Sequence, residues 1–342
     1  MTQASENKRI SEHAAAQVII DEASEGQRVD NFLAKVLKGV PKSHIYRILR
    51  SGEVRVNKGR VDASRKLKLN DVVRVPPIRV SAKSKVHDSL TPLKSVFENA
   101  VVYEDDAMLV IDKPAGFAVH GGSGISRGVI EQLRLERPKA KFLELVHRLD
   151  RETSGVLLLA KRRSALVALH QAIRANKTDK RYSVLVAGEW QDTKKRVVLD
   201  LQKYVLPNGE RRVNVVTDKR KDKFNEAQVS ETIYYLKESF EGFSLLEAKL
   251  VTGRTHQLRV QLAHLGFPIV GDDKYGDFEL NKRLQKQGLK RMFLHSIETK
   301  LHHPISNERL RLLAPLPMAL DRFIKTLSKK TEKLSKIDEK EI

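Results

Sequence analysis

The chain has 342 residues, of which 40% are hydrophobic, enough apolar material for a folded core. It contains no Cys, which excludes disulfides and thiolate metal sites, and no apolar run approaches the roughly 20 residues that cross a bilayer. We therefore expect a cytoplasmic protein that makes no membrane contact. The 64 Lys and Arg against 43 Asp and Glu give a net charge of +21, which favours a partner with many phosphates, a nucleic acid. A soluble basic protein, or one that binds an acidic membrane surface, is the alternative.

The composition divides the chain into five segments and indicates an α+β fold. Residues 1–16 are polar without a period and are predicted to be disordered, and residues 17–76 form a small module. Residues 77–98 lack any period and are predicted to be a linker. Residues 99–324 mix strands and helices in one large domain. Residues 325–342 are a charged tail, expected to be a frayed helix or a disordered end.

The small module begins with a predicted helix in which Val29, Phe32 and Leu33 share one face. Pro41 marks the start of a second helix, whose apolar stripe is Ile45, Ile48 and Leu49, and Gly52 is a candidate C-cap. Residues 54–56 and 71–75 alternate as strands, and residues 57–59 form a turn.

The second helix of the module has a basic outer surface. Lys42, Arg47 and Arg50 lie outside the apolar stripe, and Arg55 lies on the hairpin that follows. Such a surface suits an RNA backbone, although a solvated surface helix is the commoner explanation. The order of residues 28–33, 41–57 and 69–75 closely resembles the S4 RNA-binding domain, and this resemblance implies that the four side chains contact RNA.

The large domain opens with two strand-like runs and the turn Lys113-Pro-Ala-Gly, followed by His120-Gly-Gly-Ser-Gly. The glycine-rich stretch lacks the spacing of a phosphate-binding or dinucleotide-binding loop. We expect a flexible loop beside an active site.

A cluster of charged residues follows at His147-Arg-Leu-Asp-Arg-Glu-Thr-Ser-Gly155 and runs into the apolar residues 156–160, a predicted buried strand. Asp150 is flanked by Arg148 and Arg151, and such a carboxylate should stay ionised at neutral pH, as a nucleophile or a charge stabiliser must. A structural ion pair of Asp and Arg explains the local sequence equally well.

The stretch 147–155 resembles the signature of the RluA family of pseudouridine synthases, His-Arg-Leu-Asp-x-x-Thr-Ser-Gly. The resemblance implies an enzyme that isomerises uridine to pseudouridine in RNA, with a mixed, largely antiparallel sheet. It also implies that Asp150 is the catalytic carboxylate and that Arg148 displaces the target base from its helix.

Two further stretches resemble the same family. Lys180-Arg-Tyr is similar to its Lys-x-Tyr motif, which implies that Tyr182 stacks on the target base, although an ordinary strand aromatic would look the same. Residues 253–261 are similar to its Gly-Arg-Thr-His-Gln-Ile-Arg-Val-His motif, which implies that Arg259 pairs with the catalytic Asp. Arg254, His256 and Gln257 are candidate RNA contacts on this resemblance, and bracing of the loop is the alternative role of Arg254. Gln261 stands where the family has His, and Ser296 where it has Ala.

Within the family, the resemblance is strongest to members that act on large-subunit (23S) ribosomal RNA. The reaction breaks the N1–C1′ bond and rejoins the base through C5, so we expect no cofactor, and the spacing of the His residues fits no metal site. Asp150 could attack C1′, or stabilise cationic character there while a C2′ proton leaves. A non-catalytic ribosome-assembly factor and a glycosylase of the same bond are the rival functions. A monomer is expected.

Overall fold

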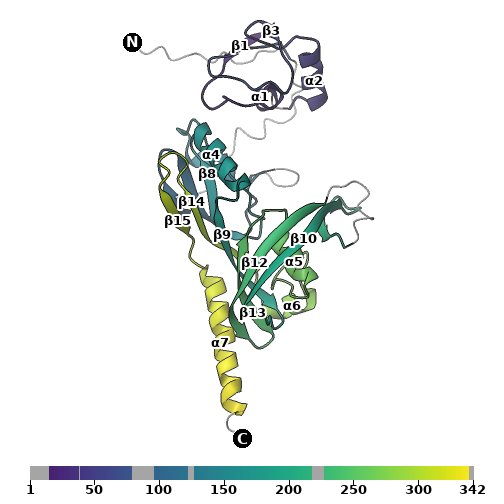
Figure 1. The fold of residues 1–342 in the computed structure, drawn as a ribbon, viewed down its shortest axis with the longest axis vertical. Coiled ribbons are helices and arrows are strands. Elements are labelled where there is room, and N and C mark those ends of the chain that lie inside the picture. The colour runs from purple at the N-terminus through teal and green to yellow at the C-terminus, as the bar shows by residue number, and fades with distance from the viewer. Residues whose placement is uncertain (1–14, 38, 79–95, 122–126, 218–226, 339–342) are drawn as a thin grey trace. The chain divides into compact units, whose positions relative to one another are not determined.

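The computed structural model describes residues 15–37, 39–78, 96–121, 127–217 and 227–338, with side chains to residue 328. The chain forms two compact units, residues 1–93 and 94–342, which are drawn in Figure 1 and described separately. The predictions of a disordered start, of the central part of the linker and of a loop at residues 122–124 lie outside the described residues.

The first unit is a four-stranded antiparallel sheet, with strand order β1-β4-β2-β3, combined with two helices. Its elements are β1 (Ala16–Ile19), α1 (Val29–Val36), α2 (Lys42–Arg50), β2 (Arg55–Val56), β3 (Gly59–Arg60) and β4 (Val72–Val75). Both predicted helices are confirmed. Gly52, just after α2, has a φ of +74°, the left-handed conformation that ends many helices.

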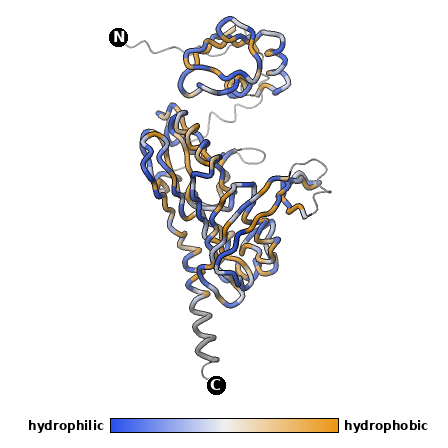
Figure 2. Tube along the Cα trace, in the orientation of Figure 1, coloured by the Kyte–Doolittle hydropathy of each residue, from blue (hydrophilic) through white to orange (hydrophobic). Residues whose placement is uncertain are grey.

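The apolar stripes of the two helices meet in one core. Phe32 and Leu33 of α1 and Ile45 and Ile48 of α2 are all buried and pack with Val73 of β4. Figure 2 shows apolar segments running through this unit as well as through the second. Each unit therefore has a core of its own, as an independently folding domain requires.

The described residues of the second unit form seventeen elements. They are η1 (Glu98–Ala100), β5 (Val101–Glu104), β6 (Met108–Lys113), α3 (Val129–Glu136), β7 (Glu144–Leu145), β8 (Ser154–Ala160), α4 (Arg163–Arg174), β9 (Asp179–Ala187), β10 (Lys194–Val205), β11 (Arg211–Val215), β12 (Gln228–Phe240), β13 (Phe243–Leu250), α5 (Gln257–His264), α6 (Phe278–Lys286), β14 (Leu294–His302), β15 (Arg309–Leu313) and α7 (Met318–Asp338).

One large sheet organises this unit, with strand order β11-β10-β12-β13-β9-β14-β8-β6-β5. Strand β15 pairs with β14 and β7 with β8. Among the described strands every pair is antiparallel except β14 with β8, which confirms the predicted mixed, largely antiparallel sheet. Helix α4 packs on β8, α5 on β10 and β11, and α7 against β12 (Figure 1).

The segment boundaries differ from the predicted ones at four places. Ile78, predicted to lie in the linker, is buried in the core of the first unit. Ala16, predicted to end the disordered terminus, begins β1 and pairs with Val75. Phe97, predicted to lie in the linker, is fully buried in the core of the second unit. Leu327, predicted to lie in the charged tail, is buried in helix α7. In each case a single apolar residue joins a core that a composition window cannot reveal.

A close approach of β8 to β14 explains the glycine that ends the charged stretch. Gly155 has a φ of +109°, and a Cβ added there would lie 2.2 Å from the carbonyl oxygen of Ser296. Only glycine fits this position without displacing β14. The parallel pairing of Gly155 with Ser296 thereby fixes where the chain leaves the loop that carries Asp150.

Candidate active site

The loop that carries Asp150 connects β7 to β8 and is held by a buried lysine. The ammonium of Lys113, at the end of β6, donates hydrogen bonds to the carbonyl oxygens of Pro114 (3.0 Å), Phe117 (2.9 Å) and Arg151 (3.1 Å). The side chain is fully buried, and these three acceptors match the three N–H donors of an ammonium group. Lys113 therefore joins the turn after β6 to the loop of Asp150.

Two side chains from the start of α5 face the carboxylate of Asp150. Nη1 of Arg259 lies 3.5 Å and Nε2 of His256 lies 3.9 Å from its Oδ2. The arginines beside Asp150 in the sequence do not take this place. Nε of Arg151 donates to the carbonyl oxygen of Gly116 (3.2 Å), and no ion pair joins Arg148 or Arg151 to Asp150 among the described residues.

Arg259 is held more tightly by another carboxylate than by Asp150. Its Nε and Nη2 donate to the two oxygens of Asp272 at 2.7 and 2.6 Å, a bidentate pair in which both side chains are almost completely buried. Burial alone would raise the pKa of Asp272, but the hydrogen bonds from Arg259 keep it below its usual value. Asp272 thus remains ionised and fixes the guanidinium in front of Asp150.

His256 adopts a left-handed backbone conformation, with φ +52°, which is uncommon for a residue other than glycine. Its Nδ1 lies 2.9 Å from the hydroxyl of Tyr275, and that hydroxyl accepts a hydrogen bond from the amide of Val213 (2.9 Å). The hydroxyl hydrogen is then free to point at Nδ1, which puts the ring proton on Nε2, facing Asp150. Burial lowers the pKa of His256, so the ring is neutral at neutral pH.

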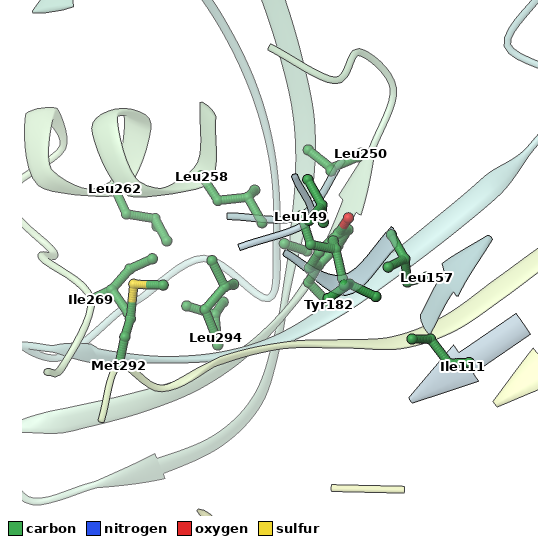
Figure 3. Close-up of a cluster of buried hydrophobic side chains, with 14 of the residues drawn as sticks. Ile111, Leu149, Leu157, Tyr182, Leu250, Leu258, Leu262, Ile269, Met292 and Leu294 are labelled. Carbon is green, nitrogen blue, oxygen red and sulfur yellow. The ribbon is translucent and has the colours of Figure 1, made fainter. Parts of the chain in front are cut away.

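A cavity of about 290 Å³ opens beside Asp150 and is lined by Tyr182 on β9, Leu250 on β13, and Arg254, His256 and Arg259. Figure 3 shows Tyr182 in the cluster of buried side chains that includes Leu250. Burial raises the pKa of Tyr182 to about 12, so its hydroxyl stays protonated.

A second, more polar cavity of about 780 Å³ also borders Asp150. Arg148, Asp150, His256 and Arg259 line both cavities, and Arg148 is exposed to solvent. Asp150 therefore lies where a small pocket meets a wider, charged cleft. A base could enter the pocket while its backbone stays in the cleft.

Gln257 does not fit the predicted RNA contact. The side chain is only 3% exposed, and its amide nitrogen donates to the carbonyl oxygen of Glu231 and to the hydroxyl of Thr232. Its amide oxygen accepts from the hydroxyl of Thr252 and from the amide of Arg254. Because all four hydrogen-bonding positions are used within the protein, Gln257 braces the turn before α5. Arg254 itself is exposed, with Nε donating to the carbonyl oxygen of Val229.

Three residues of this region received no role from the sequence. Asp272 and Tyr275 lie in stretches that resemble patterns of the same family, but the resemblance gave neither residue a role. Their contacts with Arg259 and His256 reveal one. Lys180 lines the small cavity, and burial lowers its pKa. The only sequence signal for Lys180 was its position two residues before Tyr182 in the resemblance to the Lys-x-Tyr motif.

The first unit carries the four basic side chains that were predicted to contact RNA. All four are exposed: Lys42, Arg47, Arg50 and Arg55. Nη1 of Arg47 lies 4.0 Å from Glu53, and Arg55 donates to the carbonyl oxygens of Gly52 and Lys58. They extend from α2 and β2, as the helical and strand periods predict.

Among the described residues, no helix combines the length and apolar composition that spanning a bilayer requires.

Comparison with known proteins identifies both units. A family model described as RNA pseudouridylate synthase matches residues 107–264, and the S4 domain model matches residues 27–73. A ribosomal large subunit pseudouridine synthase C of Pasteurella multocida is 48% identical over 323 residues, which cover 94% of this chain and 96% of the relative. The chain belongs to the RNA pseudouridylate synthase family. The predicted uridine isomerase is therefore confirmed at the level of the family, and the small module is an S4 domain.

Other relatives support the same family assignment. A protein of the same name from Yersinia pestis is 50% identical over 310 residues, covering 90% of this chain and 94% of the relative. The solved structure of human RNA pseudouridylate synthase domain containing 4 is 26% identical, with a TM-score of 0.55, and covers 67% of this chain and 93% of that one.

Proposed function

We propose that this pseudouridine synthase isomerises specific uridines of large-subunit (23S) ribosomal RNA, with Asp150 as the carboxylate that acts on the sugar. The observation that carries the assignment of Asp150 is its place between a base-sized pocket and an open basic cleft, opposite Arg259 and His256. The names of the curated relatives, the S4 domain and the charge of +21 support the RNA substrate.

The target uridine enters the pocket only after it leaves its stack in the RNA, which costs a few kcal/mol. Tyr182 stacks on the extruded base, and Arg148, exposed at the mouth, fills the vacated space. These contacts offset part of the cost of extrusion.

Asp150 then acts at the sugar while the N1–C1′ bond breaks. The uracil keeps its ring atoms, turns, and forms a bond from C5 to C1′; C5 loses a proton and N1 gains one. An ionised carboxylate serves both by attack at C1′ and by stabilising positive charge there while a C2′ proton leaves. Arg259 holds the carboxylate in place, and Arg254 and His256 bind the RNA at the rim.

In the S4 domain, Lys42, Arg47, Arg50 and Arg55 bind phosphates and position the RNA. Gln257 has no part in this proposal. Cytoplasmic location and a monomeric state stay predictions.

The test replaces Asp150 with Asn, which keeps the size of the side chain but removes its charge. Pseudouridines in ribosomal RNA are mapped in cells that lack the protein, then after the wild type or Asp150→Asn is restored. We expect the wild type alone to restore them, while both proteins bind RNA with similar affinity. Full restoration by Asp150→Asn would show that the carboxylate is dispensable, and free uracil in the reaction would indicate a glycosylase instead.

A further inference from the structure

A third cavity, of about 500 Å³, lies beside the uridine pocket and has no part in the mechanism above. It is bounded by residues 176–179 between α4 and β9, by residues 249–251 at the end of β13, and by residues 300–302 and 309–311 on β14 and β15. Leu250 lines both this cavity and the uridine pocket. The two cavities are therefore neighbours across one side chain.

Part of the lining of the third cavity is apolar. Leu250 and Leu301 are buried, and Val251 and Leu310 are partly exposed toward it. Its volume lies within the range of roughly 300–1,000 Å³ typical of small-ligand pockets. Apolar side chains of this kind suit the face of a nucleobase, which loses contact with water when it is covered.

The rest of the lining of the third cavity is mostly basic. It carries five Lys and Arg residues, Lys177, Lys249, Lys300, Arg309 and Arg311, against the single acid Asp179. Lys249 pairs with Asp179 at 3.3 Å, and Lys300 and Arg311 pair with Glu298. The side chains of Lys177 and Arg309 are exposed and have no hydrogen bond or ion pair among the described residues.

We propose that the third cavity binds a nucleotide next to the target uridine in the same RNA strand. The base lies against Leu250, Leu301 and Leu310, and Lys177 and Arg309 bind its phosphate. Charge complementarity selects a polyanion, and the shared wall at Leu250 places the cavity one side chain from the uridine. This proposal rests on the proposed function, because it needs an RNA strand whose uridine occupies the adjacent pocket.

The first test measures binding, independently of turnover. The double variant Lys177→Glu/Arg309→Glu is compared with Lys286→Glu/Lys290→Glu, which reverses the same number of charges at exposed lysines that line none of the three cavities. The probe is an unmodified transcript of large-subunit ribosomal RNA, and its Kd is measured at several salt concentrations, with all variants in the Asp150→Asn background.

We expect the cavity variant to bind at least tenfold more weakly than the control variant. Its plot of log K against log salt should also be flatter by about 0.7 to 0.9, since the two side chains bind one phosphate and each lost phosphate contact removes about that much slope. Equal affinities and slopes for the two double variants would overturn the proposal and leave an acidic peptide as the occupant.

The second test locates the nucleotide. In a short RNA that contains a converted uridine, each flanking base is removed in turn, and KM is measured for enzymes with an intact Asp150. We expect one abasic position to raise KM for the wild type and for the control double variant but not for Lys177→Glu/Arg309→Glu. If no flanking position behaves this way, the cavity does not bind a neighbouring base. Conversion by Asp150→Asn would refute the proposed function while leaving the binding comparison intact.

Discussion

Asp272 shows how a residue that touches no substrate can set the geometry of a reacting group. Its two oxygens accept four hydrogen bonds, two from the guanidinium of Arg259 and two from the amides of Lys274 and Tyr275. The guanidinium is also within 5.3 Å of the Tyr275 ring centroid. Arg259 therefore cannot turn away from Asp150 without breaking a buried ion pair.

Replacing Asp272 with Asn tests this positioning role. The amide cannot supply the second acceptor or the charge, so we expect kcat to fall by roughly a hundredfold while KM changes little. Stability should fall by about 3 kcal/mol, because a buried charge loses its partner. Steady-state kinetics and denaturant unfolding measure the two effects.

Asp273→Asn is the matched control. Asp273 accepts from the same Nη2 of Arg259 at 2.9 Å, but its side chain is 64% exposed. We expect a change in stability of less than about 1 kcal/mol and nearly normal kcat. Similar losses in the two variants would contradict the role given to Asp272.

At the scale of elements, the contact between β8 and β14 supports the loop of Asp150. His295 on β14 is completely buried, with Nδ1 2.8 Å from the hydroxyl of Ser154 on β8 and Nε2 3.0 Å from the carbonyl oxygen of Ala314. The Ser154 hydroxyl also accepts a hydrogen bond from Arg291 (2.7 Å). A neutral imidazole with its proton on Nε2 satisfies all these contacts.

This contact makes the stability of the protein sensitive to acid. Burial lowers the pKa of His295 from 6.5 to about 4. As the pH falls, the unfolded chain takes up a proton on this residue before the folded chain does. The contribution of His295 to the free energy of unfolding is therefore complete above pH 6.5 and is lost between pH 6.5 and about 4. The loss from this residue is on the order of 3 kcal/mol. His147, whose pKa burial also lowers to about 4, adds to it.

The measurement is the free energy of unfolding at pH 7 and pH 5, for the wild type and for His295→Gln. The glutamine can donate to Ala314 and accept from Ser154 but does not titrate. We expect the variant to lose less stability between the two pH values than the wild type. Equal losses would mean that His295 does not contribute to the acid sensitivity.

At the scale of the whole molecule, the S4 domain and the candidate active site lie in two units with separate cores. The exposed basic side chains of α2 and β2 lie in the first unit, and Asp150 with its partners lies in the second. Loss of the first unit should therefore weaken RNA binding more than it slows the chemical step.

Deleting residues 1–93 tests this division. We expect RNA affinity to fall and its salt dependence to weaken, because phosphate contacts are lost. The single-turnover rate at saturating enzyme should stay close to that of the full chain. Comparison of Kd with this rate is the measurement, and an equal loss in both would argue that the S4 domain takes part in assembling the active site.

The local spacing of apolar residues predicted several elements of the fold. The helical period of Val29, Phe32 and Leu33 and of Ile45, Ile48 and Leu49 predicts α1 and α2, because the apolar face of a short helix must pack on a core. The apolar run 156–160 predicts a buried strand for the same reason. Ala16, Phe97 and Leu327 were misplaced because each joins its core through a partner far away in the sequence.

The sequence alone determined a basic chain of two parts with a charged loop around Asp150, because charge and period are local properties. The resemblance of its motifs to the RluA family implied an RNA-modifying enzyme. Only the tertiary structure decided which charges meet. Arg259 and His256 face Asp150 in place of the neighbouring Arg151, and Asp272 holds Arg259. Gln257 is turned inward although its motif suggested an RNA contact. Hydrogen bonds and ion pairs depend on distance in space, and β-sheet pairing brings together residues more than a hundred positions apart.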